Sequence, residues 1–68
     1  MTDMVMVNGT SIVIDKGMSV TALLMRESYD LQRVAVEKNG HIVPRSAFDS
    51  DVLINGDKLE VVHFVGGG

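Results

Sequence analysis

The sequence ends in three consecutive glycines, Gly66, Gly67 and Gly68, directly after an apolar segment. Glycine loses more backbone entropy on ordering than any other residue and adds no side-chain packing, so this run makes a poor structural element. It does make an arm thin enough to enter a narrow channel and present the α-carboxylate of Gly68, which is ionised at neutral pH. Such a carboxylate can attack an activated phosphate. We therefore expect the tail to be the reactive part of the chain.

The alternative for these glycines is a frayed end or the remnant of an expression tag. A tag remnant normally carries serine or other tag residues as well, which favours the functional interpretation. We predict a folded domain over residues 1–65 and a flexible C-terminal glycine tail over residues 66–68, because three glycines have little to pack against.

The other reactive side chains do not form a catalytic or metal-binding pattern. His41 and His63 are not at metal-ligand spacing, and we interpret His63 as a partly buried strand residue. Asp49, Asp51 and Asp57 depart from the spacing of a calcium-binding loop, so we interpret them as turn residues. No serine has a paired base close in sequence. We predict neither a catalytic residue nor a metal site in this chain.

The composition fits one small globular domain. The 68 residues suffice for a single core, and a hydrophobic fraction of 46% argues against disorder. There is no cysteine, which excludes disulfides, cysteine-based zinc sites and a cysteine nucleophile or persulfide on this chain. If sulfur chemistry takes place here, another protein must handle the sulfur first.

The charge pattern disfavours nucleic acid and anionic membranes as partners. The net charge is −3, and the six basic residues are scattered rather than clustered. An acidic balance is compatible with a basic protein partner. No apolar run approaches the length of a transmembrane helix, and the N-terminus lacks an export signal, so we expect a cytoplasmic protein.

Three Asn-Gly pairs divide the chain, at residues 8–9, 39–40 and 55–56. Asn-Gly between apolar runs is a strong turn signal because both residues tolerate positive φ. The first pair lies between residues 4–7 and 11–14 and predicts an N-terminal hairpin.

The rest of the chain predicts one short helix and three further strands. Ser19 is a suitable N-cap for a helix over residues 20–28, which is too short to be stable without packing. Pro44 should end strand pairing because it has no amide hydrogen to donate. The expected elements after the helix are strands at residues 34–38 and 41–43, a helical turn at 45–48 and a last strand at 58–65.

This order, β-β-α-β-β-β, predicts an α+β domain with a mixed sheet curled around one main helix. The first and last strands would lie parallel in the centre. If Leu59 and Val61 face the helix, Val62 and Phe64 lie on the open face and form a docking patch. The alternative is a bulge that turns Phe64 into the core. Arg45 either pairs with acidic groups on a partner or is a solvated surface residue.

Three stretches resemble the ThiS family, whose members are ubiquitin-like β-grasp sulfur carriers of thiamin biosynthesis. They are residues 6–9, residues 42–45 with Phe48, and residues 55–68, and the resemblance covers the whole chain. Many members end in two glycines where this chain has three, so Gly67 and Gly68 correspond to the functional pair and Gly66 lengthens the arm.

The resemblance implies that a ThiF-like enzyme adenylates the carboxylate of Gly68 with MgATP. A sulfur donor protein then converts the adenylate to a thiocarboxylate, and a ThiG-like thiazole synthase takes the sulfur into the thiazole ring. Gly66 and Gly67 would enter the partner's active site, with Val62, Phe64 and Arg45 as docking residues. The chain would be a carried co-substrate rather than an enzyme and would bind no cofactor itself.

Three other functions stay open at this point. A related sulfur carrier could use the same tail chemistry with a different acceptor, in molybdopterin formation, cysteine synthesis or tRNA thiolation. A ubiquitin-like modifier would be joined through Gly68 to lysines of target proteins. An interaction domain with an inert tail is the third.

Overall fold

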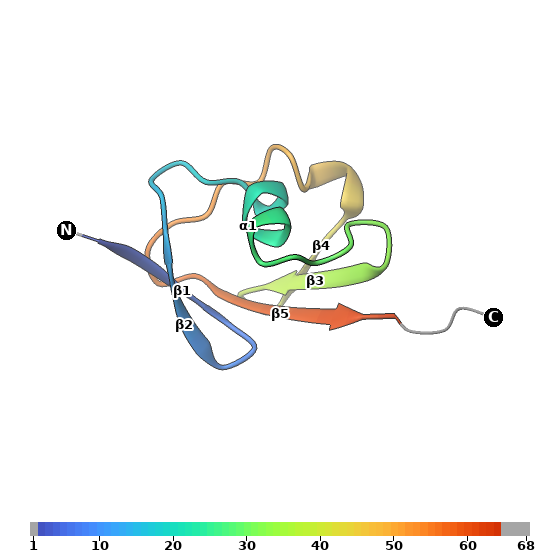
Figure 1. Ribbon diagram of the computed structural model, residues 1–68, viewed down its shortest axis with the longest axis horizontal. Coiled ribbons are helices and arrows are strands. Elements are labelled where there is room, and N and C mark those ends of the chain that lie inside the picture. Colours follow the sequence, from blue (N-terminus) through green and yellow to red (C-terminus); the bar gives the residue numbers. More distant parts are fainter. Residues whose placement is uncertain (1, 65–68) are drawn as a thin grey trace.

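The elements follow the predicted order along residues 2–64, which are the residues described by the computed structural model (Figure 1). They are β1 (Asp3–Val7), β2 (Thr10–Ile14), α1 (Val20–Arg26), β3 (Val34–Lys38), β4 (His41–Val43), a single 3₁₀ turn (Arg45–Ala47) and β5 (Lys58–His63). The predicted domain boundary at residue 65 and the predicted tail over residues 66–68 lie outside the described residues.

The strands form one mixed sheet in the order β2-β1-β5-β3-β4. β5 lies in the centre, parallel to β1 and antiparallel to β3, and the two outer pairs are antiparallel hairpins. Helix α1 packs across one face of this sheet and leaves the other face open (Figure 1). The predicted α+β architecture, with parallel central strands and one main helix, is confirmed.

Two of the Asn-Gly pairs close hairpins. Asn8 and Gly9 have φ values of 50° and 83°, and Val7 pairs directly with Thr10 across the turn. Asn39 and Gly40 repeat this geometry between β3 and β4, with φ values of 53° and 85°. Positive φ at both central residues is the type I′ turn, whose twist matches that of the flanking strands.

The third Asn-Gly pair makes a different turn, because no strand pair flanks it. Gly56 alone has positive φ, at 92°, and the amide of Asp57 donates to the carbonyl of Ile54 at 3.1 Å. This turn leads into β5, as the sequence predicted.

Helix α1 begins at the predicted residue, Val20, and ends at Arg26, two residues before the predicted end. The hydroxyl of Ser19 accepts a hydrogen bond from the amide of Ala22 at 3.0 Å, as an N-cap does. At the other end, Ser28 has φ 65°, its amide donates to Met25 O, and the amide of Tyr29 donates to Leu24 O at 2.9 Å. These two bonds form a Schellman motif. The predicted end at residue 28 was wrong because a serine, rather than a glycine, occupies the left-handed position.

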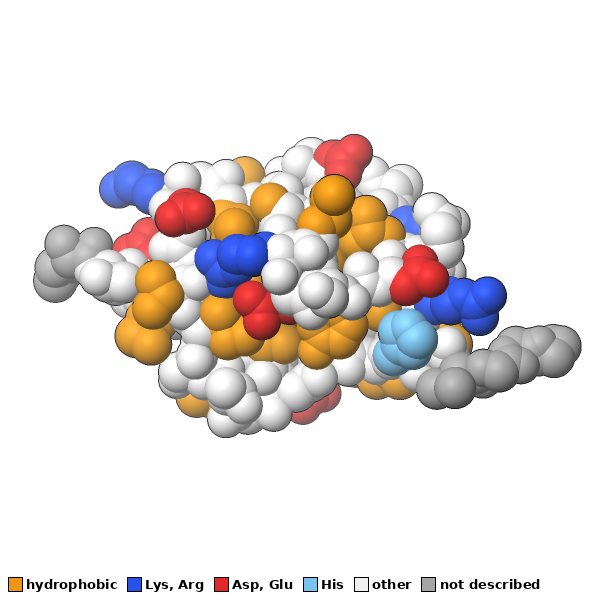
Figure 2. All heavy atoms as spheres, viewed as in Figure 1, with side chains coloured by type: hydrophobic (Ala, Val, Ile, Leu, Met, Phe, Trp, Pro, Cys, Tyr) orange, Lys and Arg blue, Asp and Glu red, His pale blue; other side chains and the backbone are white. Residues whose placement is uncertain are grey.

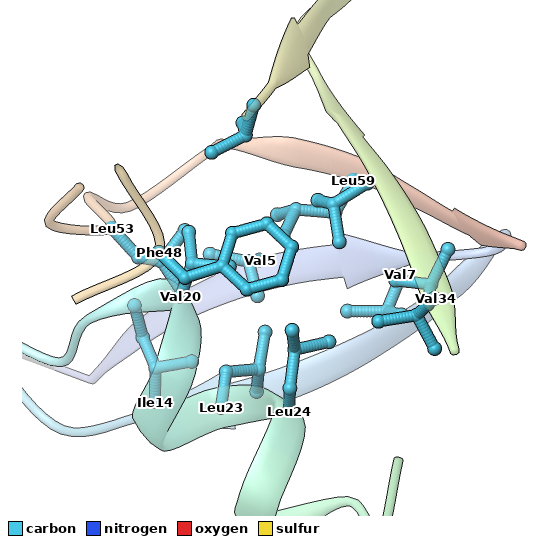
Figure 3. Close-up of a cluster of buried hydrophobic side chains, with 13 residues drawn as sticks. Val5, Val7, Ile14, Val20, Leu23, Leu24, Val34, Phe48, Leu53 and Leu59 are labelled. Atoms are coloured by element: carbon cyan, nitrogen blue, oxygen red, sulfur yellow. The ribbon is translucent and has the colours of Figure 1, made fainter. Parts of the chain in front are cut away.

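The core lies between α1 and the sheet (Figure 3). Leu23 and Leu24 point from the helix toward the strands, and the ring of Phe48, which follows the 3₁₀ turn, lies close to Val20. The fully buried side chains come from all layers of the fold and are Val20, Leu23, Leu24, Val34, Val36, Leu53 and Leu59.

Candidate partner-docking interface

The two faces of β5 have the predicted orientation. Leu59 and Val61 are buried against the helix side, whereas Glu60 and Val62 are exposed on the open face. Strand pairing ends at His63, two residues before the predicted end, and the amide of Phe64 still donates to Arg33 O at 2.7 Å. The side chain of Phe64 is 55% exposed, so no bulge turns it into the core.

Asn8 holds β5 beyond the point where β1 ends. The amide of Val61 donates to Asn8 Oδ1 at 2.8 Å, and Asn8 Nδ2 donates to Val61 O at 3.1 Å. The side-chain amide thereby replaces a strand partner and extends the contact that begins with the bond from Asn8 N to Leu59 O. From the sequence, Asn8 was predicted to be a turn residue only, and nothing in the Asn-Gly signal indicated this second role.

Arg45 organises the segment that leads into β3. Its Nε donates to Leu31 O at 2.9 Å, and its Nη2 donates to Gln32 O at 3.3 Å and to Val34 O at 3.2 Å. Since Val34 pairs with His63, these bonds also support the end of β5. The arginine is nonetheless exposed. Pairing of Arg45 with acidic groups on a partner stays a prediction, and the residue has an intramolecular role besides.

The structure brings the three predicted docking residues to one end of the sheet. Phe64 and Arg45 line one shallow hollow of about 200 Å³, together with Ala35 and Ile42. Val62 lies in an adjoining groove that is also lined by Ala35 and Ile42. The docking role of these side chains stays a prediction, but they occupy one continuous surface.

Sequence reasoning missed two members of this surface, Ala35 and Ile42. Ile42 is 76% exposed, and Ala35 lies directly opposite Val62 in the β3–β5 ladder. The alternation of buried Val34 and Val36 with exposed Ala35 would have placed Ala35 on the open face. Its position beside Val62 depends on the register, which the residues alone did not fix.

The three aspartates each have a partner within the described chain. Asp49 accepts a hydrogen bond from the Thr21 hydroxyl, and Asp51 forms an ion pair with Lys38. Asp57 is buried and accepts from Ile54 N and from Asn39 Nδ2, each at 2.9 Å. Within residues 2–64, no group of three or more His, Asp or Glu side chains is placed to hold a metal ion.

His63 differs from its prediction. It was expected to be a partly buried strand residue, but it is exposed at the last paired position of β5.

Charged side chains of both signs are interspersed on the face of the molecule seen in Figure 2, without one large basic region. This agrees with the scattered basic residues of the sequence. In the part of the chain that the structure describes, no helix is both long and apolar enough to cross a bilayer. The predicted site residues Gly66, Gly67 and Gly68 lie outside the described residues.

The mixed sheet with parallel central strands and a single covering helix is the β-grasp arrangement of ubiquitin-like proteins. A crystal structure of the thiamine biosynthesis protein ThiS from Geobacter metallireducens superposes with a TM-score of 0.80 at 35% sequence identity, covering 96% of this chain and 99% of that one. The ThiS family profile matches residues 4–68. The chain therefore belongs to the ThiS family, as its sequence resemblance indicated.

Two further relatives differ in the share of their own length that matches this chain. An uncharacterised protein, ycf40, of Pyropia yezoensis is 39% identical over 64 residues, which are 94% of this chain and 90% of the relative. A thiazole synthase of Paramagnetospirillum magneticum is 44% identical over 62 residues, or 91% of this chain. The chain spans only 19% of the length of that thiazole synthase.

Proposed function

We propose that this chain is a sulfur carrier protein of thiamin biosynthesis whose reactive group is the carboxylate of Gly68. The single observation that carries the proposal is the ThiS family match, which extends through the glycine tail to residue 68. In this proposal the partner enzymes bind the β-grasp domain, and the tail is the part that reacts.

The proposed chemistry proceeds in two steps on the partner enzymes. A carboxylate oxygen of Gly68 attacks the α-phosphorus of MgATP on a ThiF-like enzyme and releases pyrophosphate. The resulting acyl-adenylate has AMP as a good leaving group, which a carboxylate lacks. A persulfide on a donor protein then attacks the acyl carbon and displaces AMP, which joins the chain to the donor through an acyl disulfide. A thiol, on the donor or in solution, attacks the donor-side sulfur, releases the thiocarboxylate of Gly68 and is itself oxidised to a disulfide with the donor. The chain has no cysteine, so the sulfur must arrive on another protein.

The thiocarboxylate then donates its sulfur to thiazole formation on a ThiG-like thiazole synthase. Two relatives named thiazole synthase contain a segment similar to about nine-tenths of this chain, which supports a shared function of the two parts. In this proposal the chain is a co-substrate rather than an enzyme, MgATP is bound by the partner, and the reactions take place in the cytoplasm.

Docking occurs through the surface at the end of β5. Val62 and Phe64 supply exposed apolar area, and Arg45 supplies charge at its edge. β5 pairs with β3 through His63, and Asn8 bonds to Val61 on its other side, so the backbone beneath this surface is held in place. Gly66 and Gly67 then enter the partner's active site.

The test is the intact mass of the chain after incubation with a ThiF-like enzyme, MgATP and a sulfide source. We expect a gain equal to the replacement of one oxygen by sulfur, mapped to the peptide that contains Gly68 and absent without ATP. An unchanged mass, with an enzyme proven active on its own carrier, would contradict the proposal. A thiocarboxylate that yields no thiazole with thiazole synthase would indicate a different sulfur acceptor.

A further inference from the structure

Two carboxylates face each other on the open side of the sheet. Glu37 of β3 and Glu60 of β5 are directly opposite in the antiparallel register, and both are exposed. Like charges at directly opposed positions of a sheet are destabilising. Within residues 2–64, neither glutamate takes part in an ion pair. The free domain therefore contains an electrostatic repulsion that its own fold does not relieve.

The nearby cation, Lys58, does not neutralise the pair. It lies on β5 two residues before Glu60, and it lines a hollow of about 320 Å³ together with Glu37 and Glu60. Its amine forms no ion pair with either carboxylate within the described chain. One amine beside two carboxylates leaves a net negative charge at an open hollow.

An apolar groove adjoins the same two glutamates. Ala35, Ile42 and Val62 line it together with Glu37 and Glu60, and its volume is about 70 Å³. The carboxylates thus lie between a polar hollow on one side and aliphatic side chains on the other.

We propose that this surface binds a lysine or arginine side chain of the thiazole synthase partner. The aliphatic stem of that side chain lies along Ala35, Ile42 and Val62, and its cationic head sits between Glu37 and Glu60. Lysine and arginine combine an apolar stem with a charged head in this way. A free metal ion fits less well, because hard cations take six or more oxygen ligands and gain nothing from contact with the aliphatic side chains of the groove.

This inference rests on the proposed function, and the comparisons favour thiazole synthase among the partners. In two relatives, a segment like this chain and the rest of a thiazole synthase form one polypeptide, so the two are held next to each other. A cation placed between the glutamates would also remove their repulsion. Binding thereby supplies the positive charge that the free domain lacks between Glu37 and Glu60. This contribution to binding is a reason for the sheet to keep two opposed carboxylates.

The test compares two double variants that change the net charge equally. Glu37→Gln with Glu60→Gln removes the paired carboxylates. Asp3→Asn with Asp15→Asn is the matched control, because Asp3 lies on the face of β1 that carries the buried residues and Asp15 follows β2. The dissociation constant for thiazole synthase of the same organism is measured by calorimetry at low and at physiological ionic strength, with thermal unfolding of each free chain.

We expect the Glu37/Glu60 double variant to bind about tenfold or more weakly, since loss of a buried charge contact acts on affinity at this scale. Its affinity should also depend less on salt than that of the wild type. Its unfolding temperature should rise, because the repulsion is gone. The control should bind within about twofold of the wild type. A structural role of the glutamates would instead lower the unfolding temperature and the affinity together.

Unchanged affinity of the double variant, or an equal loss in the control, overturns the inference. So does a wild-type chain that gains the thiocarboxylate but does not bind thiazole synthase. Failure of the proposed function is recognised separately, by the absence of the ATP-dependent mass gain in the wild-type chain.

Discussion

At the scale of single residues, Asn8 has two structural roles: its backbone forms part of the hairpin turn, and its side chain bonds to β5. Its backbone occupies the left-handed region at φ 50°, which the hairpin turn requires, and its amide pairs with both backbone groups of Val61. Glycine would suit the turn but would lose both hydrogen bonds. Asparagine tolerates this backbone conformation and offers a donor and an acceptor together.

Replacement of Asn8 by aspartate isolates the donor half of this contact. The aspartate side chain would keep the turn geometry and the acceptor for Val61 N but would place a carboxylate oxygen against Val61 O. We expect Asn8→Asp to destabilise the domain by about 1–2 kcal/mol, because a part-buried carbonyl loses its donor. Urea unfolding measures this loss. Amide exchange at Val61 should rise more than at Val36, and uniform exchange throughout the sheet would count against a local role of Asn8.

Arg45 supports the fold as well as being a predicted docking residue. Its guanidinium donates to three carbonyls of the segment that leads into β3, so its removal would disturb that segment as well as any partner contact. A loss of binding in an Arg45 variant would therefore not separate docking from folding. Val62 and Phe64 are better probes, since both side chains are more than half exposed.

At the scale of elements, the C-terminus of α1 contains a residue that its conformation does not favour. Ser28 lies at φ 65° in the Schellman motif, a position where glycine avoids the steric cost of a Cβ atom. The side chain of Ser28 is exposed and makes no hydrogen bond within residues 2–64. The short helix therefore ends with a small amount of backbone strain.

Ser28→Gly should stabilise the domain by about 1 kcal/mol, which is the scale of the left-handed penalty in a non-glycine residue. Chemical denaturation with an unchanged m-value measures this gain. Asn39→Gly provides the comparison, because Asn39 shares the positive φ but also uses its side chain to bind Asp57 and Lys58. If Ser28→Gly destabilises the protein, the entropy that glycine adds to the unfolded chain outweighs the relief of strain.

The accuracy of prediction from sequence also differs by element. Turns at residues 8–9 and 39–40 were predictable because Asn-Gly has a direct conformational cause, and Ser19 was predictable as a cap for the same reason. The helix end at Arg26 was not, since Ser28 carries no local stop signal. The alternation of buried and exposed residues in β5 placed Val62 correctly, because period-2 burial needs no knowledge of the partner strand.

To predict which residues face each other across two strands, the strand register must be known. The sequence alone did not determine that register. The opposition of Glu37 and Glu60, and of Ala35 and Val62, follows from a pairing that joins segments more than 20 residues apart. The parallel pairing of β1 with β5 likewise came from the required closure of the sheet and from family resemblance. Propensity acts locally and does not choose among long-range pairings.

At the scale of the whole molecule, the last strand occupies the centre of the sheet. β5 has neighbours on both sides, Asn8 continues its contact with the first hairpin, and Phe64 remains bonded to the segment before β3. A small domain of this kind buries a modest share of its surface, so contacts from both hairpins matter for holding this strand. The position of Val62 on β5 is therefore held by contacts with both hairpins.

The last prediction separates docking from folding on this surface. Val62→Asp and Phe64→Asp should each weaken binding to the adenylating enzyme or to thiazole synthase by about tenfold or more, because a desolvated carboxylate replaces apolar contact area. Their unfolding free energies should fall by at most about 1 kcal/mol, since both side chains are exposed in the free domain. Val13→Asp is the matched control, because Val13 is 51% exposed on the same open face, on the outer strand β2. Equal loss of binding in the control would indicate a general charge effect, and outright unfolding of either test variant would show that its side chain contributes to the core. Weak binding with intact folding in the two test variants alone would locate the docking surface at the end of β5.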